Sequence, residues 1–145
     1  MLKRFLLSIL LVSTCLLASV EDVQTTYDKG LESYKLKDFQ SSFELFNSIY
    51  FKKLDDINFN FYFGRSAYET GNYEKALAAF ERVEIYDGTN IRNKLEMART
   101  YFMLKMYEDS ENSYLEVLAN PNIPENIRTD IELSLSKVSK VNAVK

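Results

Sequence analysis

The residues best placed to carry out chemistry are Ser134 and Lys137, which form an S-x-x-K sequence near the C-terminus. A lysine three residues after a serine is the pattern with which serine acyl enzymes arrange their nucleophile. The pattern is common by itself, and the companion S-D-N and K-T-G motifs are absent from the sequence. We therefore do not expect Ser134 to act as a catalytic nucleophile.

Other catalytic and metal-binding arrangements are excluded by composition. The chain has no histidine and one cysteine, Cys15. This composition excludes zinc or copper sites built from histidine and cysteine, and it excludes Ser-His and Cys-His catalytic pairs. It also excludes disulfides in the exported chain. The acidic pairs at 21–22 and 55–56 precede expected helices, where negative charge is favourable, and calcium binding there is the weaker alternative. We expect no enzyme, no metal and no cofactor.

The first twenty residues differ from the rest of the chain. Lys3 and Arg4 are followed by 16 residues without a charge, from Phe5 to Val20. This stretch is short for a membrane span and has the pattern of a secretory signal peptide, with an uncleaved anchor as the alternative. We therefore predict that residues 1–20 export the protein to the periplasm or cell envelope of a bacterium.

Two interpretations of Cys15 remain open. Residues 12–15 resemble a lipobox, where bacterial lipoproteins are cleaved and acylated, although Thr14 replaces the small residue expected before the cysteine. Lipidation of Cys15 would tether the protein to a membrane; the alternative is an inert cysteine in an apolar signal. Removing the signal leaves 16 basic and 21 acidic residues, a net charge of −5, which argues against a nucleic-acid partner.

An internal repeat of 34 residues organises the rest of the chain. Five columns recur with this spacing, and each column keeps one residue character. The columns are small (Gly30, Gly64, Ala98), aromatic (Phe39, Tyr73, Tyr107), small (Ser42, Ala76, Ser110), aromatic (Phe46, Phe80, Tyr114) and β-branched (Ile49, Val83, Val117).

These columns resemble the tetratricopeptide repeat (TPR), most closely from Gly64 to Phe80. The resemblance implies an all-α, right-handed superhelix of three helix hairpins, at about residues 21–54, 55–88 and 89–122. A further helix over 123–145 follows Pro124, and its apolar residues recur at helical spacing opposite a polar side. We expect seven helices, no sheet, and a last helix that acts as a solubilising cap over the third hairpin.

The first helices of the three hairpins are expected to line a concave groove. Their inward positions carry mainly aromatic residues and arginine, which commonly anchor protein interfaces. The predicted groove residues are Tyr27, Leu31, Tyr34, Phe61, Arg65, Tyr68, Leu95, Arg99 and Phe102. Such a groove would suit an extended peptide with aromatic or acidic groups.

Packing roles compete with binding roles at several of these positions. Tyr34, Tyr68 and Phe102 could instead pack between repeats. Arg65 and Arg99 could be solvated, or could pair with Glu69 and Glu96 at helical spacing. The clamp that TPR domains use to hold chaperone C-termini is missing, because Tyr27, Leu31 and Glu96 occupy its positions.

Residues 90–128 resemble the end of the N-terminal TPR domain of surface lipoprotein assembly modifiers, through the sequences L-E-M-A-R at 95–99 and I-P-E-N-I-R at 123–128. In that family a periplasmic TPR domain precedes an outer-membrane β-barrel and helps to deliver lipoproteins to the cell surface. The resemblance implies a β-barrel partner and a role as an accessory subunit or truncated relative of such a device. The main prediction is an envelope scaffold that binds a protein or peptide in its groove.

Overall fold

The computed structural model describes residues 22–144, which form seven α-helices and one short 3₁₀ helix and contain no strand. Residues 1–20, including Cys15, lie outside the described residues. The elements are α2 (Val23–Lys35), α3 (Phe39–Ile49), η1 (Tyr50–Lys52), α4 (Ile57–Glu69), α5 (Tyr73–Tyr86), α6 (Ile91–Met103), α7 (Tyr107–Leu118) and α8 (Glu125–Asn142).

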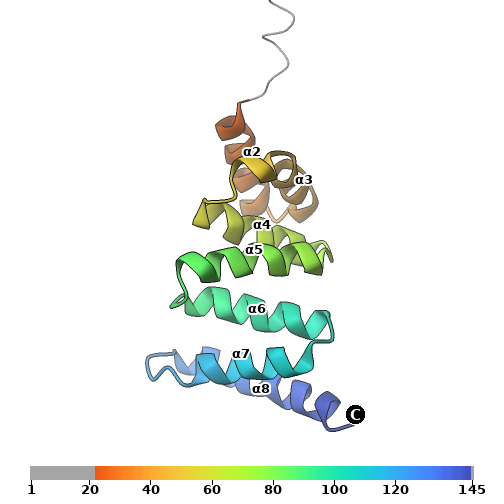
Figure 1. The fold of residues 1–145 in the computed structure, drawn as a ribbon, viewed down its shortest axis with the longest axis vertical. Coiled ribbons are helices and arrows are strands. Elements are labelled where there is room, and N and C mark those ends of the chain that lie inside the picture. The colour runs from red at the N-terminus through yellow and green to blue at the C-terminus, as the bar shows by residue number, and fades with distance from the viewer. Residues whose placement is uncertain (1–21, 145) are drawn as a thin grey trace, which may run out of the picture.

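The helices form an elongated stack in chain order (Figure 1). Helices α2 and α3, α4 and α5, and α6 and α7 pair as antiparallel hairpins, and each hairpin packs on the next through its second helix. The all-α superhelix of three hairpins plus a C-terminal helix is therefore confirmed. Within residues 22–144, no helix is both long enough and apolar enough to cross a membrane.

The turn inside each hairpin has the same geometry in all three copies. Its central residue has a left-handed backbone, with φ of 62° at Lys37, 78° at Gly71 and 62° at Lys105. This conformation ends a helix by allowing the next amide to reach back to an unpaired carbonyl. These closing hydrogen bonds run from Asp38 N to Ser33 O, from Asn72 N to Ala67 O and from Met106 N to Tyr101 O.

The small-residue columns bring the two helices of a hairpin close together. A Cβ atom on Gly64 would lie 2.6 Å from Cε1 of Phe80, whose ring is fully buried. In the first and third hairpins a serine strengthens the contact. Ser42 Oγ donates to the carbonyl oxygen of Gly30 at 3.0 Å, and Ser110 Oγ donates to the equivalent carbonyl of Ala98 at 2.8 Å.

A second repeated contact joins the aromatic residues on either side of each turn. Each pair has an edge-to-face geometry, which is a favourable arrangement of two aromatic rings. The pairs are Tyr34–Phe39, Tyr68–Tyr73 and Phe102–Tyr107, with ring centroids 5.6, 5.5 and 5.6 Å apart.

Two groups of buried residues form the core. The first is rich in phenylalanine and joins α3, α4 and α5, with Phe59 and Phe63 stacked at its centre. The second joins α6 and α7 to α8, which contributes Ile131 and Val138. The polar side of α8 is exposed, so this helix covers the apolar end of the third hairpin as expected of a cap.

Candidate functional site

All nine predicted groove residues lie on the first helices of the hairpins, α2, α4 and α6. Eight of them are half-buried, and Arg99 is exposed. Four of them, Tyr27, Leu31, Phe61 and Tyr68, pack against the first core, and Leu95 and Phe102 pack against the second. The structure therefore places the predicted residues on equivalent helices, and their individual surroundings separate packing roles from accessible ones.

Tyr27 has mainly a packing role. Its ring contacts the rings of Phe46 and Phe59 at 5.8 and 6.2 Å, and the Lys53 ammonium lies 4.8 Å above it. Burial, followed by the charge of Asp56, raises the pKa of the Tyr27 hydroxyl to about 12. Tyr27 therefore stays neutral at physiological pH.

Tyr34 links the first two repeats, because its ring also packs edge-to-face on Tyr62 at 5.1 Å. Phe61 contacts Phe80 in its own hairpin, and the Arg92 guanidinium from α6 lies 4.8 Å above the Phe61 ring. The packing alternative left open by the sequence thus applies to Tyr34, and Phe61 is partly covered by the following repeat.

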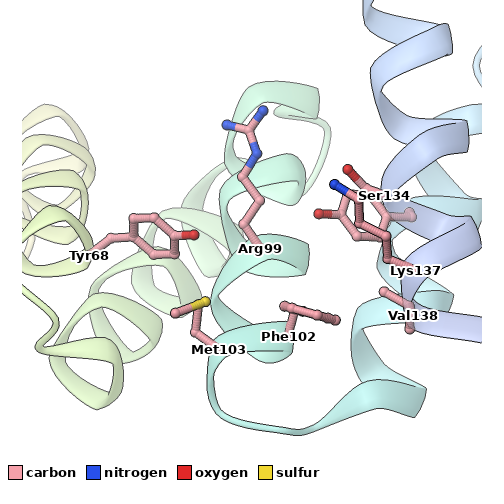
Figure 2. A pocket seen from close by; sticks show the side chains of 8 residues that line it. Tyr68, Arg99, Phe102, Met103, Ser134, Lys137 and Val138 are labelled. Atoms are coloured by element: carbon pink, nitrogen blue, oxygen red, sulfur yellow. The ribbon is translucent and has the colours of Figure 1, made fainter. Parts of the chain in front are cut away.

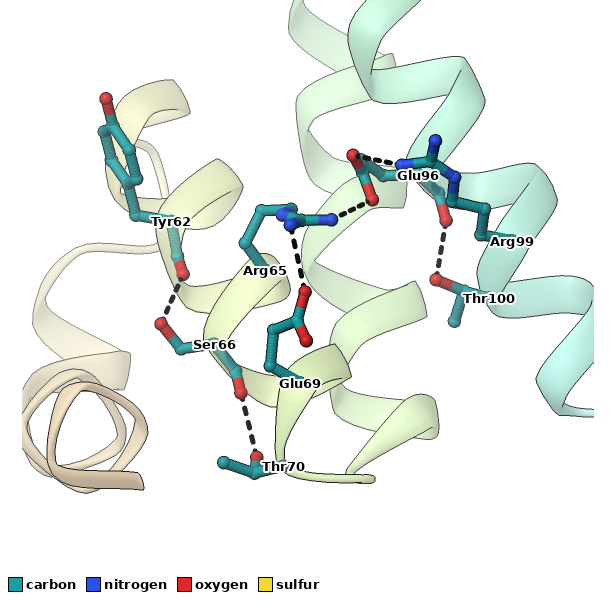
Figure 3. A network of polar contacts seen from close by, with 8 residues as sticks. All are labelled: Tyr62, Arg65, Ser66, Glu69, Thr70, Glu96, Arg99 and Thr100. Carbon is teal, nitrogen blue, oxygen red and sulfur yellow. Dashed lines mark hydrogen bonds and ion pairs between the residues drawn. The ribbon is translucent and has the colours of Figure 1, made fainter. Parts of the chain in front are cut away.

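A charged network joins α4 to α6 (Figure 3). Glu96 is 5% exposed and accepts hydrogen bonds from Arg65 on one oxygen and from Arg99, at 3.2 Å, on the other. Arg65 also pairs with Glu69 at 3.0 Å. Both arginines therefore make the helical-spacing pairs considered from the sequence, and Arg65 adds a pair across the repeat boundary.

The two arginines have different exposures. The side chain of Arg65 is 18% exposed and that of Arg99 is 45% exposed. Burial opposes the charge on Arg65, but the Glu96 carboxylate and the Tyr34 hydroxyl outweigh this effect and raise the pKa of Arg65 above its ordinary value. Arg65 is thus a permanently charged link between repeats, whereas much of the Arg99 side chain is accessible to solvent.

Arg99 opens onto a pocket of about 240 Å³ between α4, α6 and α8 (Figure 2). Tyr68 lies at its α4 side, and the buried Tyr114 of α7 also lines it. The full lining consists of Tyr68, Arg99, Phe102, Met103, Tyr114, Ser134, Lys137 and Val138. Three of the predicted groove residues, Tyr68, Arg99 and Phe102, therefore meet at one hollow.

The sequence analysis missed the contribution of α8 to this pocket. Helix α4 packs on both α2 and α6, whereas the close backbone packing of α8 is on α7. The pocket lies where α8 and α6 face each other. The sequence signal for this contribution was the S-x-x-K pattern of Ser134 and Lys137. Helical periodicity, however, does not show which neighbouring helix a side chain faces, so these residues were not assigned to the groove.

The surroundings of Ser134 are those of an ordinary helical serine. Its Oγ donates a hydrogen bond to the carbonyl oxygen of Asp130 at 2.9 Å, one turn earlier. Among residues 22–144, no group of three or more acidic or cysteine side chains is arranged to hold a metal ion. The residues that line the pocket supply apolar contact, hydroxyl groups and positive charge.

Comparison with known proteins finds similarity of fold and no similarity of sequence to a family model or curated protein. No family model and no curated protein matches the sequence. The fold is similar to PcrH in complex with the chaperone binding region of PopD, with a TM-score of 0.67 and 17% identity over 82% of this chain and 92% of that chain.

Two further solved structures carry bound peptides. The Yersinia enterocolitica type III secretion chaperone SycD, in complex with a peptide of the translocator YopD, has a TM-score of 0.67 and 15% identity over 86% of this chain and 98% of that one. The first TPR of Spaghetti (RPAP3), bound to an HSP90 peptide, has a TM-score of 0.67 and 14% identity over 83% and 93%. These likenesses show that the chain has a TPR-like helical repeat fold.

Proposed function

We propose that the protein binds an extended segment of a partner protein along the inner faces of α2, α4 and α6. The observation that carries this proposal is the convergence of Tyr68, Arg99 and Phe102 on one pocket of about 240 Å³. Aromatic and arginine side chains around a hollow are the usual anchors of protein recognition. Peptides bound to several structurally similar proteins support the same class of function.

The proposed role is that of a non-catalytic scaffold. Ser134 donates its hydrogen bond to its own helix, and the S-D-N and K-T-G motifs that accompany S-x-x-K in serine acyl enzymes are absent from the sequence. We further propose that the scaffold works in the cell envelope, on the basis of the charge pattern of residues 1–20. Detection of the protein in periplasmic and membrane fractions, with and without a Cys15→Ala change, tests this location and the lipidation of Cys15.

Site-specific crosslinking tests the groove. A photoreactive phenylalanine analogue at Phe102 would face the pocket, whereas the same analogue at Leu115 of α7, which is 49% exposed, would lie outside it. We expect a discrete crosslinked partner in intact cells from position 102 and none from position 115.

An Arg99→Ala change is expected to reduce the crosslink from position 102, because it removes an accessible cation from the pocket. This variant is preferable to Arg65→Ala, which would break the contact with Glu96 that joins α4 to α6, whereas the pair of Arg99 with Glu96 lies within α6. Equal crosslinking from positions 102 and 115, or none from either, would contradict the groove proposal.

An accessory role in lipoprotein export is the second candidate, and residues 90–128 provide its motivation. The proposed partner in that case is an outer-membrane β-barrel protein. Identification of the species crosslinked at position 102 separates the two candidates, because a β-barrel protein among the products supports the export role. A partner outside the envelope would argue against both the export role and the proposed location.

A further inference from the structure

The pocket between α4, α6 and α8 has an electrostatic character opposite to that of the whole chain. The protein has a net charge of −3, yet the charged side chains that line the pocket are Arg99 and Lys137, with no carboxylate among them. Among residues 22–144, no ion pair engages Lys137, whereas Arg99 pairs with Glu96. A ligand group in this pocket would therefore meet one uncommitted cation and one shared cation.

Two carboxylates that lie close to Arg99, those of Glu96 and Asp130, are outside the lining of this pocket. Glu96 is buried and divides its two oxygens between Arg65 and Arg99. Asp130 lies with Arg99 and Ser134 around an adjacent, smaller hollow of about 30 Å³. The pocket thus retains the unpaired Lys137 of α8 together with an apolar part formed by Phe102 and Met103 of α6 and Val138 of α8.

The hydroxyl groups add neutral hydrogen-bond donors. Burial raises the pKa of Tyr68, with a further contribution from Tyr73. Burial also raises the pKa of Tyr114, against the opposing effect of hydrogen bonds with Ser134 and Arg99. Both tyrosines consequently keep their protons at neutral pH and do not repel an anion.

We propose that this pocket binds the side chain of a glutamate or aspartate in the partner segment, with its carboxylate between Arg99 and Lys137. The apolar part of the segment would pack on Phe102, Met103 and Val138, which line the same hollow. This inference rests on the proposed function and adds a preference for an acidic residue at one position. A pocket of about 240 Å³ has room for an entire acidic side chain rather than for a carboxylate alone.

A positional-scanning library of nine-residue peptides tests the preference on the immobilised full-length chain. Acetylated and amidated ends leave side chains as the only source of carboxylate, and a second library with free C-termini supplies a terminal one. We expect enrichment of glutamate or aspartate at one position in the blocked library. A Lys137→Glu change should weaken binding of the enriched peptides by about fivefold or more, because it replaces attraction with repulsion.

Lys140→Glu is the matched control, since it makes the same charge change on the exposed side of α8, outside the pocket. It should leave the enriched sequences and their affinities unchanged. Circular dichroism spectra that match the wild type would show that both variants are folded. Selection of lysine or arginine by the Lys137→Glu variant would be the strongest support.

Each other outcome has a defined meaning. Three results would overturn the acidic side-chain proposal and leave the groove proposal standing. The selected peptides could show no enrichment of acidic residues, the enrichment could be unaffected by Lys137→Glu, or only peptides with free C-termini could be selected. If neither library contains any peptide that the protein retains, the groove proposal fails together with this inference.

Discussion

At the scale of single residues, Glu96 connects the stability of the repeat stack to the groove. Its buried carboxylate joins Arg65 from the preceding repeat and Arg99 from its own helix. An ion pair removed from water stabilises little by itself, but loss of one partner leaves the other charge uncompensated. Glu96 therefore holds Arg65 in place, and Arg65 in turn links α4 to α6.

We predict that Glu96→Gln lowers the free energy of unfolding by about 2–3 kcal/mol, because the half-buried Arg65 loses its main counter-charge. Urea denaturation followed by circular dichroism measures this loss. Glu69→Gln is the control: the Glu69 side chain is 33% exposed, and its pair with Arg65 should contribute at most about 0.5 kcal/mol. Similar losses in the two variants would show that the network is not organised around Glu96.

Helical spacing accounts for two of the three ion pairs in this network. The pairs of Arg65 with Glu69 and of Arg99 with Glu96 follow from helical spacing and were considered from the sequence. The pair between Arg65 and Glu96 spans 31 positions, so it depends on the angle at which two repeats stack. No local pattern contains that angle, which explains why this contact was not predicted.

At the scale of elements, the three turns inside the hairpins share one geometry but differ in sequence. Gly71 takes the left-handed conformation without a steric cost, whereas Lys37 and Lys105 have a Cβ atom in the same conformation. The role of Gly71 can be read from the sequence, because glycine is the usual residue at such a helix end. The equivalent role of the two lysines emerges from the 34-residue register.

We predict that Lys37→Gly and Lys105→Gly each raise the free energy of unfolding by about 0.5–1 kcal/mol. Glycine removes the steric cost of the left-handed backbone in the folded state. This gain in free energy exceeds the cost of the additional conformational entropy that glycine gives to the unfolded chain. Gly71→Lys provides the reverse test and should lower stability by about 1 kcal/mol. Thermal and urea unfolding of the three variants measure these changes; a loss in both lysine variants would contradict the proposed strain.

Helix α8 shows what could and could not be predicted for a whole element. Its start after Pro124, its apolar stripe and its exposed polar side all follow from the sequence. Its place beside the groove does not, because that depends on how α8 packs on α7. The predicted cap is present, and one flank of it supplies Ser134 and Lys137 to the pocket.

At the scale of the whole molecule, the stack gives its helices unequal support. The central hairpin of α4 and α5 has a neighbouring hairpin on each side, whereas α2 and α8 lie at the two ends. In a linear repeat protein, each unit is stabilised mainly by its neighbours, so the ends open more readily than the centre.

We predict that backbone amides in α4 and α5 exchange with deuterium at least about tenfold more slowly than those in α2 and α8. Hydrogen exchange followed by mass spectrometry, at neutral pH without denaturant, measures the exchange rate of each helix. Repetition in low urea should melt the end helices first. Uniform protection along the chain would instead indicate a single cooperative unit.

The placement of the pocket gives the groove a direction. The predicted groove residues of α2 are the uncharged Tyr27, Leu31 and Tyr34, whereas near α8 the pocket presents Arg99 and Lys137. A segment bound along this face meets different chemistry at its two ends, so reversal of its N-to-C orientation would exchange the groups that each end contacts. If the groove binds as proposed, it can therefore distinguish a peptide from the same residues in reverse order.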